Sequence, residues 1–512
     1  MIAAPSAGYT NAVENNSTLE IRGKVEVDWD SNGSYADESV YFLSAKGDEE
    51  IQGELGHAVM GTLDITLSNI TERFSPENSD SAIVSYLKLS LQPIKFSIGI
   101  KVSGSYEYLQ RFTGYVDEIV ANEKDGTVLF KCKDGAVKLQ RNYPQMGIYQ
   151  NYRTDELVDY IGNEGGILDA NMILETGKHK VGTAVFDGGI CIWDLMAELA
   201  EAEAGRVFFD NNGKLNFWNR YHLITPGHEW DLGDSFEILN RDGGYSEKYF
   251  KNKIKIDARP KVTMAEQVIW DMGQTNKAVS AGLNKAIVIP PNSTETIQTD
   301  FRDPITSITT PVAATDYEAN TVIDGSGTSI NANLSISKTD YAQSSVLVLT
   351  SNYNGIMYIT KFQLRGTPVK IVKEIEVENT DDVSLVTVGE KLLSIGNDFI
   401  DAEAYVIELA IKLLAKWKKM LNPYTLSINC VPMLQAGDVV SFQATKDRDC
   451  TYATHFILGK SKLDGSDGLA GSDEVTNGKY RFGTILKLSY DVGIDIFNNS
   501  LTLLDVQEVS DL

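Results

Sequence analysis

The residues with the clearest potential for chemistry lie in the stretch DWDSNGSYADE, which begins at Asp28. Asp28, Asp30 and Asn32 occupy the first, third and fifth ligand positions of a calcium loop, and Gly33 stands where such a loop turns sharply. An EF-hand also needs a helix on each side and a bidentate acid at its twelfth position. The flanks here alternate like strands, and the twelfth residue is Ser39. A helical EF-hand is therefore excluded.

Two interpretations of this stretch remain open. Asp28, Asp30 and Asn32 could converge on a calcium ion in a turn between strands, with Asp37 or Glu38 completing the oxygen shell. Alternatively, the same side chains accept hydrogen bonds from nearby backbone amides in an Asx-type turn. We keep the calcium turn as a hypothesis and predict no other cofactor.

Signatures of catalysis are missing elsewhere in the sequence. There is no GxSxG elbow, P-loop, HExxH or GxGxxG following a strand, and the chain has five histidines. Three pairs could in principle act as acid, base or nucleophile: His228 with Glu229, Cys450 with His455, and Asp491 with Asp495. Neighbours in a strand point to opposite faces, and 71 acids produce carboxylate pairs by chance. We therefore predict that the protein is not an enzyme.

The composition limits the classes of partner. At 512 residues, with 42% hydrophobic and 23% charged residues, the chain is globular and long enough for several domains. Its 46 basic against 71 acidic residues give a net charge of -25, which repels nucleic-acid backbones and anionic membranes. Specific nucleic-acid binding is therefore not expected.

Targeting signals and disulfide patterns are also missing. The first residues lack the basic and apolar regions of a secretion signal, and no run of about 18 apolar residues could span a membrane, so a soluble protein is expected. The four cysteines show no paired spacing and are predicted to be buried thiols: Cys132, Cys191, Cys430 and Cys450.

The first 140 residues alternate with a period of two, which predicts half-buried strands. The apolar positions recur at Leu63, Ile65 and Leu67 and again over residues 94–102. Turn residues separate the runs, as in Ser103-Gly104-Ser105. This spacing predicts an antiparallel barrel or sandwich.

The period then changes. A short helix is predicted from Thr154, and a second helix over residues 192–205 has an apolar stripe and ends at Gly205. A hairpin with Asn212-Gly213 at its turn follows directly. Two helices and a hairpin indicate a small α+β domain.

The remainder of the chain is predicted to be strands with one long helix. Residues 262–390 are rich in Thr, Ser, Asn and Val, which favours a second β domain. The helix is predicted from Asp401, as its N-cap, to about Met420, with acids early and lysines late. The last 90 residues return to strand patterns, interrupted by the glycine-rich loop 464–478.

Several segments, taken in order, resemble the tail hub or baseplate hub proteins of tailed bacteriophages. The N-terminal ones are VDWDSNGSYADE, GTLDITLSNITERFSPEN and RFTGYVDEIV. The later ones are LMAELAEAEAGRVFFDNNGKLNFWNR, YITKFQLRGTPV, LLAKWKKMLNP and VPMLQAGDVVSF. Each motif alone is weakly specific, but the order spans nearly the whole chain.

The resemblance implies a mainly β fold with an α+β part. The implied domains are an N-terminal β-barrel over 1–144, an α+β domain over 145–233, a second barrel from 234–261 plus 421–512, and a β-rich domain over 262–420 that ends in the long helix. It further implies a structural protein of the virion, made in the host cytoplasm. Such a subunit would form a homotrimer at the distal end of the tail, join the hexameric tail tube to tail-tip or receptor-binding proteins, and line the DNA exit channel.

Two alternatives stay open. A glycan-binding or glycan-cleaving tail fibre or spike would be favoured by a repeated β-helix period, which the sequence lacks. An extracellular adhesin built of β-sandwiches should carry a secretion signal.

Overall fold

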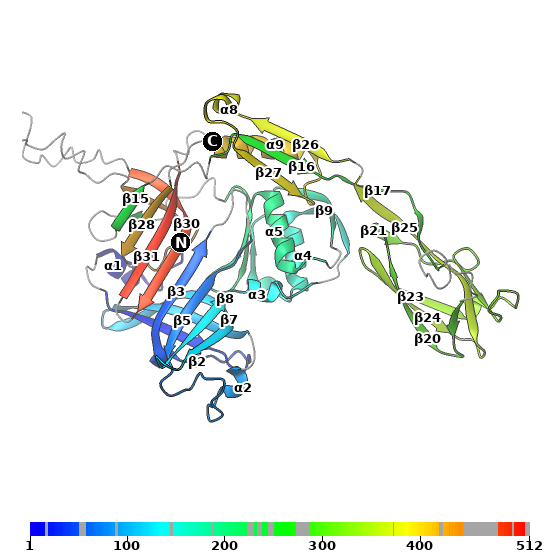
Figure 1. Cartoon of the computed structure of the whole chain (residues 1–512), viewed down its shortest axis with the longest axis horizontal. Coiled ribbons are helices and arrows are strands. Elements are labelled where there is room, and N and C mark those ends of the chain that lie inside the picture. The colour runs from blue at the N-terminus through cyan, green and yellow to red at the C-terminus, as the bar shows by residue number, and fades with distance from the viewer. Residues whose placement is uncertain are drawn as a thin grey trace, which may run out of the picture.

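The computed structural model describes residues 1–15, 19–50, 58–87, 91–143, 147–186, 189–222, 230–232, 238–243, 250–272, 286–371, 373–418, 423–429, 431–443, 480–493 and 496–506. The fold is mainly β with a smaller helical part, which confirms the predicted fold class. Figure 1 shows three regions along the long axis: a large sheet, a mixed α/β layer in the middle, and a protruding β domain. None of the described helices is long and apolar enough to cross a membrane.

The large sheet draws its strands from both ends of the chain. Its thirteen strands follow the order β15-β28-β31-β30-β3-β5-β8-β7-β6-β1-β2, with β29 and β14 pairing beside β30. The N-terminal strands are β1 (Ile21–Val27), β2 (Ala36–Asp37), β3 (Phe42–Glu50), β5 (Thr62–Ser68), β6 (Gln92–Val102), β7 (Ser105–Asn122) and β8 (Thr127–Lys133). The others are β14 (Trp230–Leu232), β15 (Ile238–Gly243), β28 (Pro423–Asn429), β29 (Val439–Gln443), β30 (Tyr480–Gly493) and β31 (Ile496–Val506).

Among the described strands, one antiparallel pairing joins the two halves of this sheet. Strands β3 and β30 pair from Ser44 opposite Gly493 to Glu50 opposite Lys487. The predicted alternation is confirmed, because Leu63, Ile65 and Leu67 are fully buried. They share one hydrophobic core with residues of β28 and β31. The described strands pair in one continuous sheet, and the closure of each half into a barrel stays a prediction.

The middle layer contains the predicted helices and hairpin. It comprises α3 (Ala136–Leu139), β9 (Ile148–Arg153), α4 (Thr154–Glu164), β10 (Met172–Leu174), β11 (Lys180–Val185), α5 (Ile192–Glu203), β12 (Arg206–Phe209) and β13 (Leu215–Trp218). The short strand β4 (Ala58–Val59) adds to the edge of β12. The left-handed residue after α5 is Ala204, and Gly205 is needed because a Cβ there would lie 2.4 Å from the Trp218 carbonyl oxygen.

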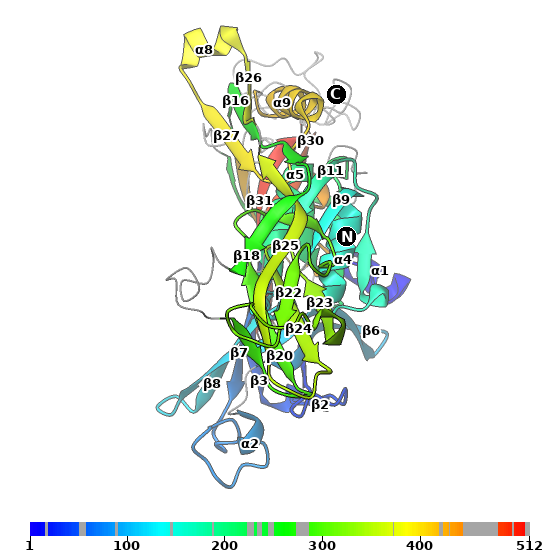
Figure 2. The same cartoon turned by 90° about the vertical axis from the view of Figure 1, so that its right-hand side faces the viewer.

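Several elements of this middle layer were expected in other domains. Strand β16 (Lys253–Ala258) pairs with β26 (Ile375–Thr380) and β27 (Leu392–Asn397), although its residues were assigned to the second barrel. The long helix α9 (Glu403–Trp417) packs on β16 and shares a core with α4 and α5, although it was assigned to the 262–420 β domain. Both differences have one cause: the apolar stripe of α9 is covered by the sheet strands β16 and β26. Figure 2 shows α9 beside this sheet, with α8 (Asp382–Val388) at its outer end.

The protruding domain consists of two sheets around a core of its own. One sheet surrounds β25 (Met357–Ile371), with β17 (Lys261–Thr263), β18 (Gln267–Asp271), β19 (Ile287–Ile289), β21 (Ile305–Ile308) and β22 (Tyr317–Asn320). The other contains β20 (Thr294–Asp300), β23 (Leu334–Asp340) and β24 (Ser344–Ser351). The remaining short helices are α1 (Ala7–Asn15), α2 (Val84–Leu87), and the 3-10 turns η1 (Ser39–Tyr41), η2 (Asp169–Asn171) and η4 (Asn331–Asn333).

Candidate functional site

The stretch from Asp28 forms a compact polar turn. Asp28 is 2% exposed, and its two carboxylate oxygens accept the backbone N–H groups of Asn32 at 3.1 Å and Gly33 at 2.8 Å. The side-chain amide of Asn32 donates to Asp30 Oδ2 at 2.7 Å, and Asn32 Oδ1 accepts the backbone N–H of Ser34 at 2.8 Å. These bonds are those of the Asx-type turn, and Ser31 and Gly33 supply its positive φ angles.

Glu38, which could have completed the oxygen shell of a calcium ion, accepts hydrogen bonds from other side chains instead. Its carboxylate accepts a hydrogen bond from the indole N–H of Trp29 at 2.9 Å. It also accepts two hydrogen bonds from the guanidinium of Arg73, at 2.7 and 3.1 Å. The Glu38 side chain is 3% exposed and that of Arg73 is 29% exposed. Among the described residues, no group of three His, Cys, Asp or Glu side chains could hold a metal ion. The calcium turn at Asp28, Asp30 and Asn32 stays a prediction.

The Glu38–Arg73 pair brings together two of the motifs on which the resemblance rests. Arg73 belongs to the RFSPEN segment, which follows the acidic turn by more than thirty residues. The aromatic rings of Trp29, Phe74 and Phe130 contact one another beneath this pair, with ring centroids 5.5–6.2 Å apart. Neither motif alone predicts this contact, because it depends on how β1 and β5 are placed in the sheet.

Two apolar side chains are exposed at the same end of the N-terminal sheet. Val40 follows the buried Glu38 and is 82% exposed, and Ile70, shortly before Arg73, is 80% exposed. The backbone around them is held by side-chain hydrogen bonds, including Asn69 Oδ1 to the N–H of Phe74 at 2.9 Å. Side-chain hydrogen bonds thus fix the backbone beside these two exposed apolar side chains.

The structure places only some of the other candidate residues. Six of them lie outside the described residues: His228, Glu229, Cys430, Cys450, His455 and Asp495. Asp491 lies on β30 opposite Lys46 of β3. Cys132 and Cys191 are buried, as predicted. Burial raises the pKa of the Cys132 thiol well above its usual value, so little reactive thiolate forms at neutral pH.

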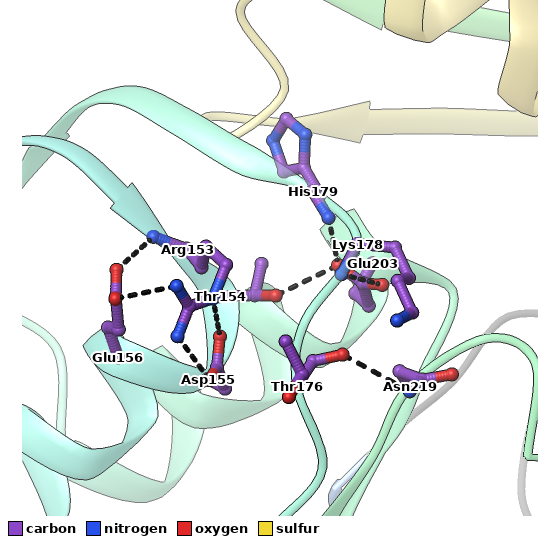
Figure 3. Close-up of polar contacts among 9 residues, drawn as sticks. All are labelled: Arg153, Thr154, Asp155, Glu156, Thr176, Lys178, His179, Glu203 and Asn219. Atoms are coloured by element: carbon purple, nitrogen blue, oxygen red, sulfur yellow. Dashed lines mark hydrogen bonds and ion pairs between the residues drawn. The ribbon is translucent and has the colours of Figure 1, made fainter.

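A buried cluster of hydrogen bonds around Glu203 connects elements of the middle layer (Figure 3), and the sequence did not indicate it. The fully buried carboxylate of Glu203, at the end of α5, accepts the Thr154 hydroxyl at 2.8 Å and the backbone N–H groups of Lys178 and His179 at 2.8 and 2.6 Å. Sequence reasoning missed it because Glu203 falls in the predicted acidic helix LMAELAEAEAG, where acids usually face solvent.

His179 connects this cluster to the long helix α9. Its ring nitrogen Nε2 lies 2.8 Å from the carbonyl oxygen of Phe399, and its ring stacks on Tyr405 of α9 with centroids 3.9 Å apart. Burial lowers the pKa of His179, so the ring is neutral at pH 7 and Nε2 donates to Phe399. Asp401, the expected N-cap of α9, instead accepts the backbone N–H of Thr183 at 3.0 Å, and Ala402 precedes the helix.

Several solved structures match nearly the whole of this chain at low sequence identity and with TM-scores below 0.5. The tail protein from Neisseria meningitidis is 9% identical, with 94% of this chain and 96% of that chain covered and a TM-score of 0.46. The 43 kDa tail protein of prophage MuSo2 from Shewanella oneidensis is 12% identical, with 95% and 96% covered and a TM-score of 0.44. A prophage tail protein from Listeria monocytogenes is 9% identical, with 94% of each chain covered and a TM-score of 0.42. No protein-family model matches the sequence, and no curated protein matches it.

Proposed function

We propose that the chain is a structural subunit of a phage tail, and that three copies form the hub at its distal end. The observation that carries this proposal is the antiparallel pairing of β3 with β30, which we call the seam. It joins a β module from the first third of the chain to a β module from the last, so that one polypeptide presents two β modules side by side in one continuous sheet.

The proposed assembly follows from counting these modules. Three chains with two modules each provide six β modules, which matches the six subunits in one ring of a tail tube. Threefold closure is also a cyclic symmetry that leaves no open interface. The exposed Val40 and Ile70 lie on a rigid end of the first module and would be covered in such a contact.

The remaining parts of the proposal concern partners and chemistry. The hub would join the tube to tail-tip or receptor-binding proteins, and acidic side chains on its inner wall would keep DNA from adhering during exit, since the chain carries a net charge of -25. It would act in the virion without catalysis of its own.

The decisive experiment is an image of the assembly. Light scattering at moderate salt should give three times the 56.4 kDa chain mass, and electron microscopy should show a ring with a central opening. Particles labelled through this protein should carry the label at the tail tip. A strict monomer that also forms no threefold ring on isolated tails would rule out the hub.

The glycan-cleaving alternative is tested separately. Incubation of the purified protein with peptidoglycan and host polysaccharides should release no fragments. Release that is abolished by changing one carboxylate would show that the protein is an enzyme.

A further inference from the structure

A cavity of about 390 Å³ is lined by strand β7 of the N-terminal sheet and by the hairpin of β12 and β13 in the middle layer. The first residues of the chain and Gln435 complete its wall. The N–H of Ile2 donates to the carbonyl oxygen of Met433 at 2.8 Å, which fixes the N-terminal segment at this place. The cavity volume lies in the range of small-molecule sites, which is roughly 300–1,000 Å³.

The hairpin turns one face to the core of the middle layer and the other face to the cavity. Leu215 and Phe217 are fully buried in that core. Asn216 lies between them and opposite Phe208, and Trp218 follows on the same side of the strand. Because neighbours in a strand point to opposite faces, Phe208, Asn216 and Trp218 point away from the core, and all three line the cavity.

Strand β7 presents the corresponding face from the other side of the cavity. Leu109 belongs to the core of the N-terminal sheet, so its neighbours Tyr108 and Gln110 lie on the opposite face of the strand. The Tyr108 ring covers Gly99 of β6, where a Cβ would lie 2.6 Å from it. Tyr108 is still 39% exposed, so its ring can be reached by a ligand.

Polar side chains of the lining keep unused capacity for hydrogen bonds. Asn216 is 7% exposed, and its side-chain nitrogen donates to the Lys214 carbonyl oxygen at 3.0 Å. Asp210 Oδ1 accepts the N–H groups of Asn212 and Lys214, both at 2.9 Å. Within the described part of the chain, Asn216 Oδ1, Asp210 Oδ2 and the side-chain amide of Gln435 have no hydrogen-bond partner. The cavity therefore offers both acceptors and donors beside aromatic rings.

The charges of the lining limit the class of ligand. Among the described residues that line the cavity, none is a lysine, arginine or histidine, and the Met1 amino group lies 2.7 Å from Asp438. An anionic ligand would find no side-chain counter-charge in the lining and would be repelled by the Asp210 carboxylate. A purely apolar ligand would leave the amide groups without partners.

We propose that this cavity binds a neutral saccharide of one or two sugar units. A sugar hydroxyl both donates and accepts hydrogen bonds, as the side-chain amides of Asn216 and Gln435 do. The apolar C–H face of a sugar ring packs on an aromatic side chain, and Tyr108 supplies one that is accessible.

The same lining supports binding rather than cleavage. Asp210 is the one residue with a carboxyl group among the described residues of the lining, whereas most glycoside hydrolases use a pair of carboxyl groups. The inference does not rest on the trimeric hub, so the binding test and the image of the assembly can fail independently.

The test is saturation-transfer NMR on the full chain with six neutral probes: glucose, galactose, N-acetylglucosamine, maltose, lactose and chitobiose. At least one of them should receive transfer from the wild-type protein. Its affinity should fall roughly tenfold in Tyr108→Ala and in Gln435→Met, because each variant removes one contact with the sugar. Gln435→Met keeps the backbone N–H that donates to Asp438. Tyr106→Ala is the matched control, since Tyr106 lies on the same face of β7 but does not line the cavity.

Charged probes and a direct view of the ligand complete the test. Glucuronate, glucose 6-phosphate and tetramethylammonium should receive less transfer than the best neutral sugar. Crystals soaked in that sugar should show it in contact with Tyr108 and Asn216. No transfer to any neutral sugar, wild-type affinity in Tyr108→Ala, a stronger response to a charged probe, or a sugar bound only at another place would each overturn the proposal.

Discussion

At the scale of single residues, the Glu38–Arg73 ion pair is the contact whose loss should most reduce the stability of the N-terminal β module. Arg73→Met leaves a Glu38 carboxylate that is 3% exposed without its cation. We expect a loss of about 2–4 kcal/mol in the free energy of unfolding, because an uncompensated buried charge remains. Urea unfolding of the two proteins measures the difference.

Two further variants make this prediction specific. Arg73→Lys keeps the charge but cannot form two parallel hydrogen bonds, so an intermediate loss is expected. Lys131→Met removes an ion pair with Glu118 in which the side chains are 46% and 56% exposed, and should change stability little. Equal stability of Arg73→Met and Lys131→Met would contradict the role assigned to Arg73.

Asp134 should make stability depend on pH. Burial raises its pKa to about 7, whereas an Asp in an unfolded chain titrates near 3.9. Between these values the folded state binds the proton more tightly, so stability is greatest below about pH 4 and falls as the pH rises to about 7. The loss from this group should be on the order of 2–4 kcal/mol.

The Asp134→Asn variant isolates this effect from the other acids. It should remove most of the fall in unfolding free energy between pH 4.5 and 7.5, while losing one hydrogen bond because the amide nitrogen cannot accept the N–H of Gly61 or Ala136. A variant whose pH profile runs parallel to that of the wild type would show that Asp134 is ionised throughout.

The calcium hypothesis is decided at the same scale. Calorimetry with calcium should detect binding to the wild-type protein and none to a variant carrying Asp28→Ala and Asp30→Ala. The same heats from both proteins would leave the stretch as a turn only, the role already performed by the hydrogen bonds of Asp28 to Asn32 and Gly33.

At the scale of elements, the seam between β3 and β30 depends on Gly47. A Cβ at this position would lie 2.0 Å from the ring of Tyr490, its partner on β30. Gly47→Ala must therefore displace a buried tyrosine ring, and we expect faster hydrogen exchange along β30 together with a lower Tm.

The matched control for this prediction is Gly396→Ala on β27. Gly396 also lies in a strand, but a Cβ there would meet nothing within 4 Å. Its exchange pattern and Tm should stay near those of the wild type. If Gly47→Ala behaves in the same way, the two halves of the sheet are not held by close packing at this point.

At the scale of the whole molecule, the net charge should govern assembly. Each chain carries -25, so the proposed trimer brings together like charges that salt screens over about 8 Å at physiological ionic strength. The trimer fraction should therefore increase from about 20 mM to 300 mM sodium chloride. Light scattering across this range checks it, and dissociation on adding salt would point to interfaces dominated by ion pairs instead.

By itself the sequence determined the local structure. Alternation predicted the buried positions of β5 and β6, and the helices from Thr154 and Ile192 form where the apolar period changes. It also supplied the acidic turn, whose Asx interpretation matches the hydrogen bonds of Asp28. These features depend on neighbours within a few residues, and short-range spacing records them directly.

Only the tertiary structure decided which elements cover one another. The apolar stripe of α9 does not specify that β16 and β26 bury it, and β24 and β25, adjacent in sequence, belong to different sheets. Likewise nothing in the spacing of Glu38 and Arg73 predicts that their side chains form an ion pair. Such contacts join residues tens to hundreds of positions apart, and their energies depend on burial that exists only once the sheets and helices have packed.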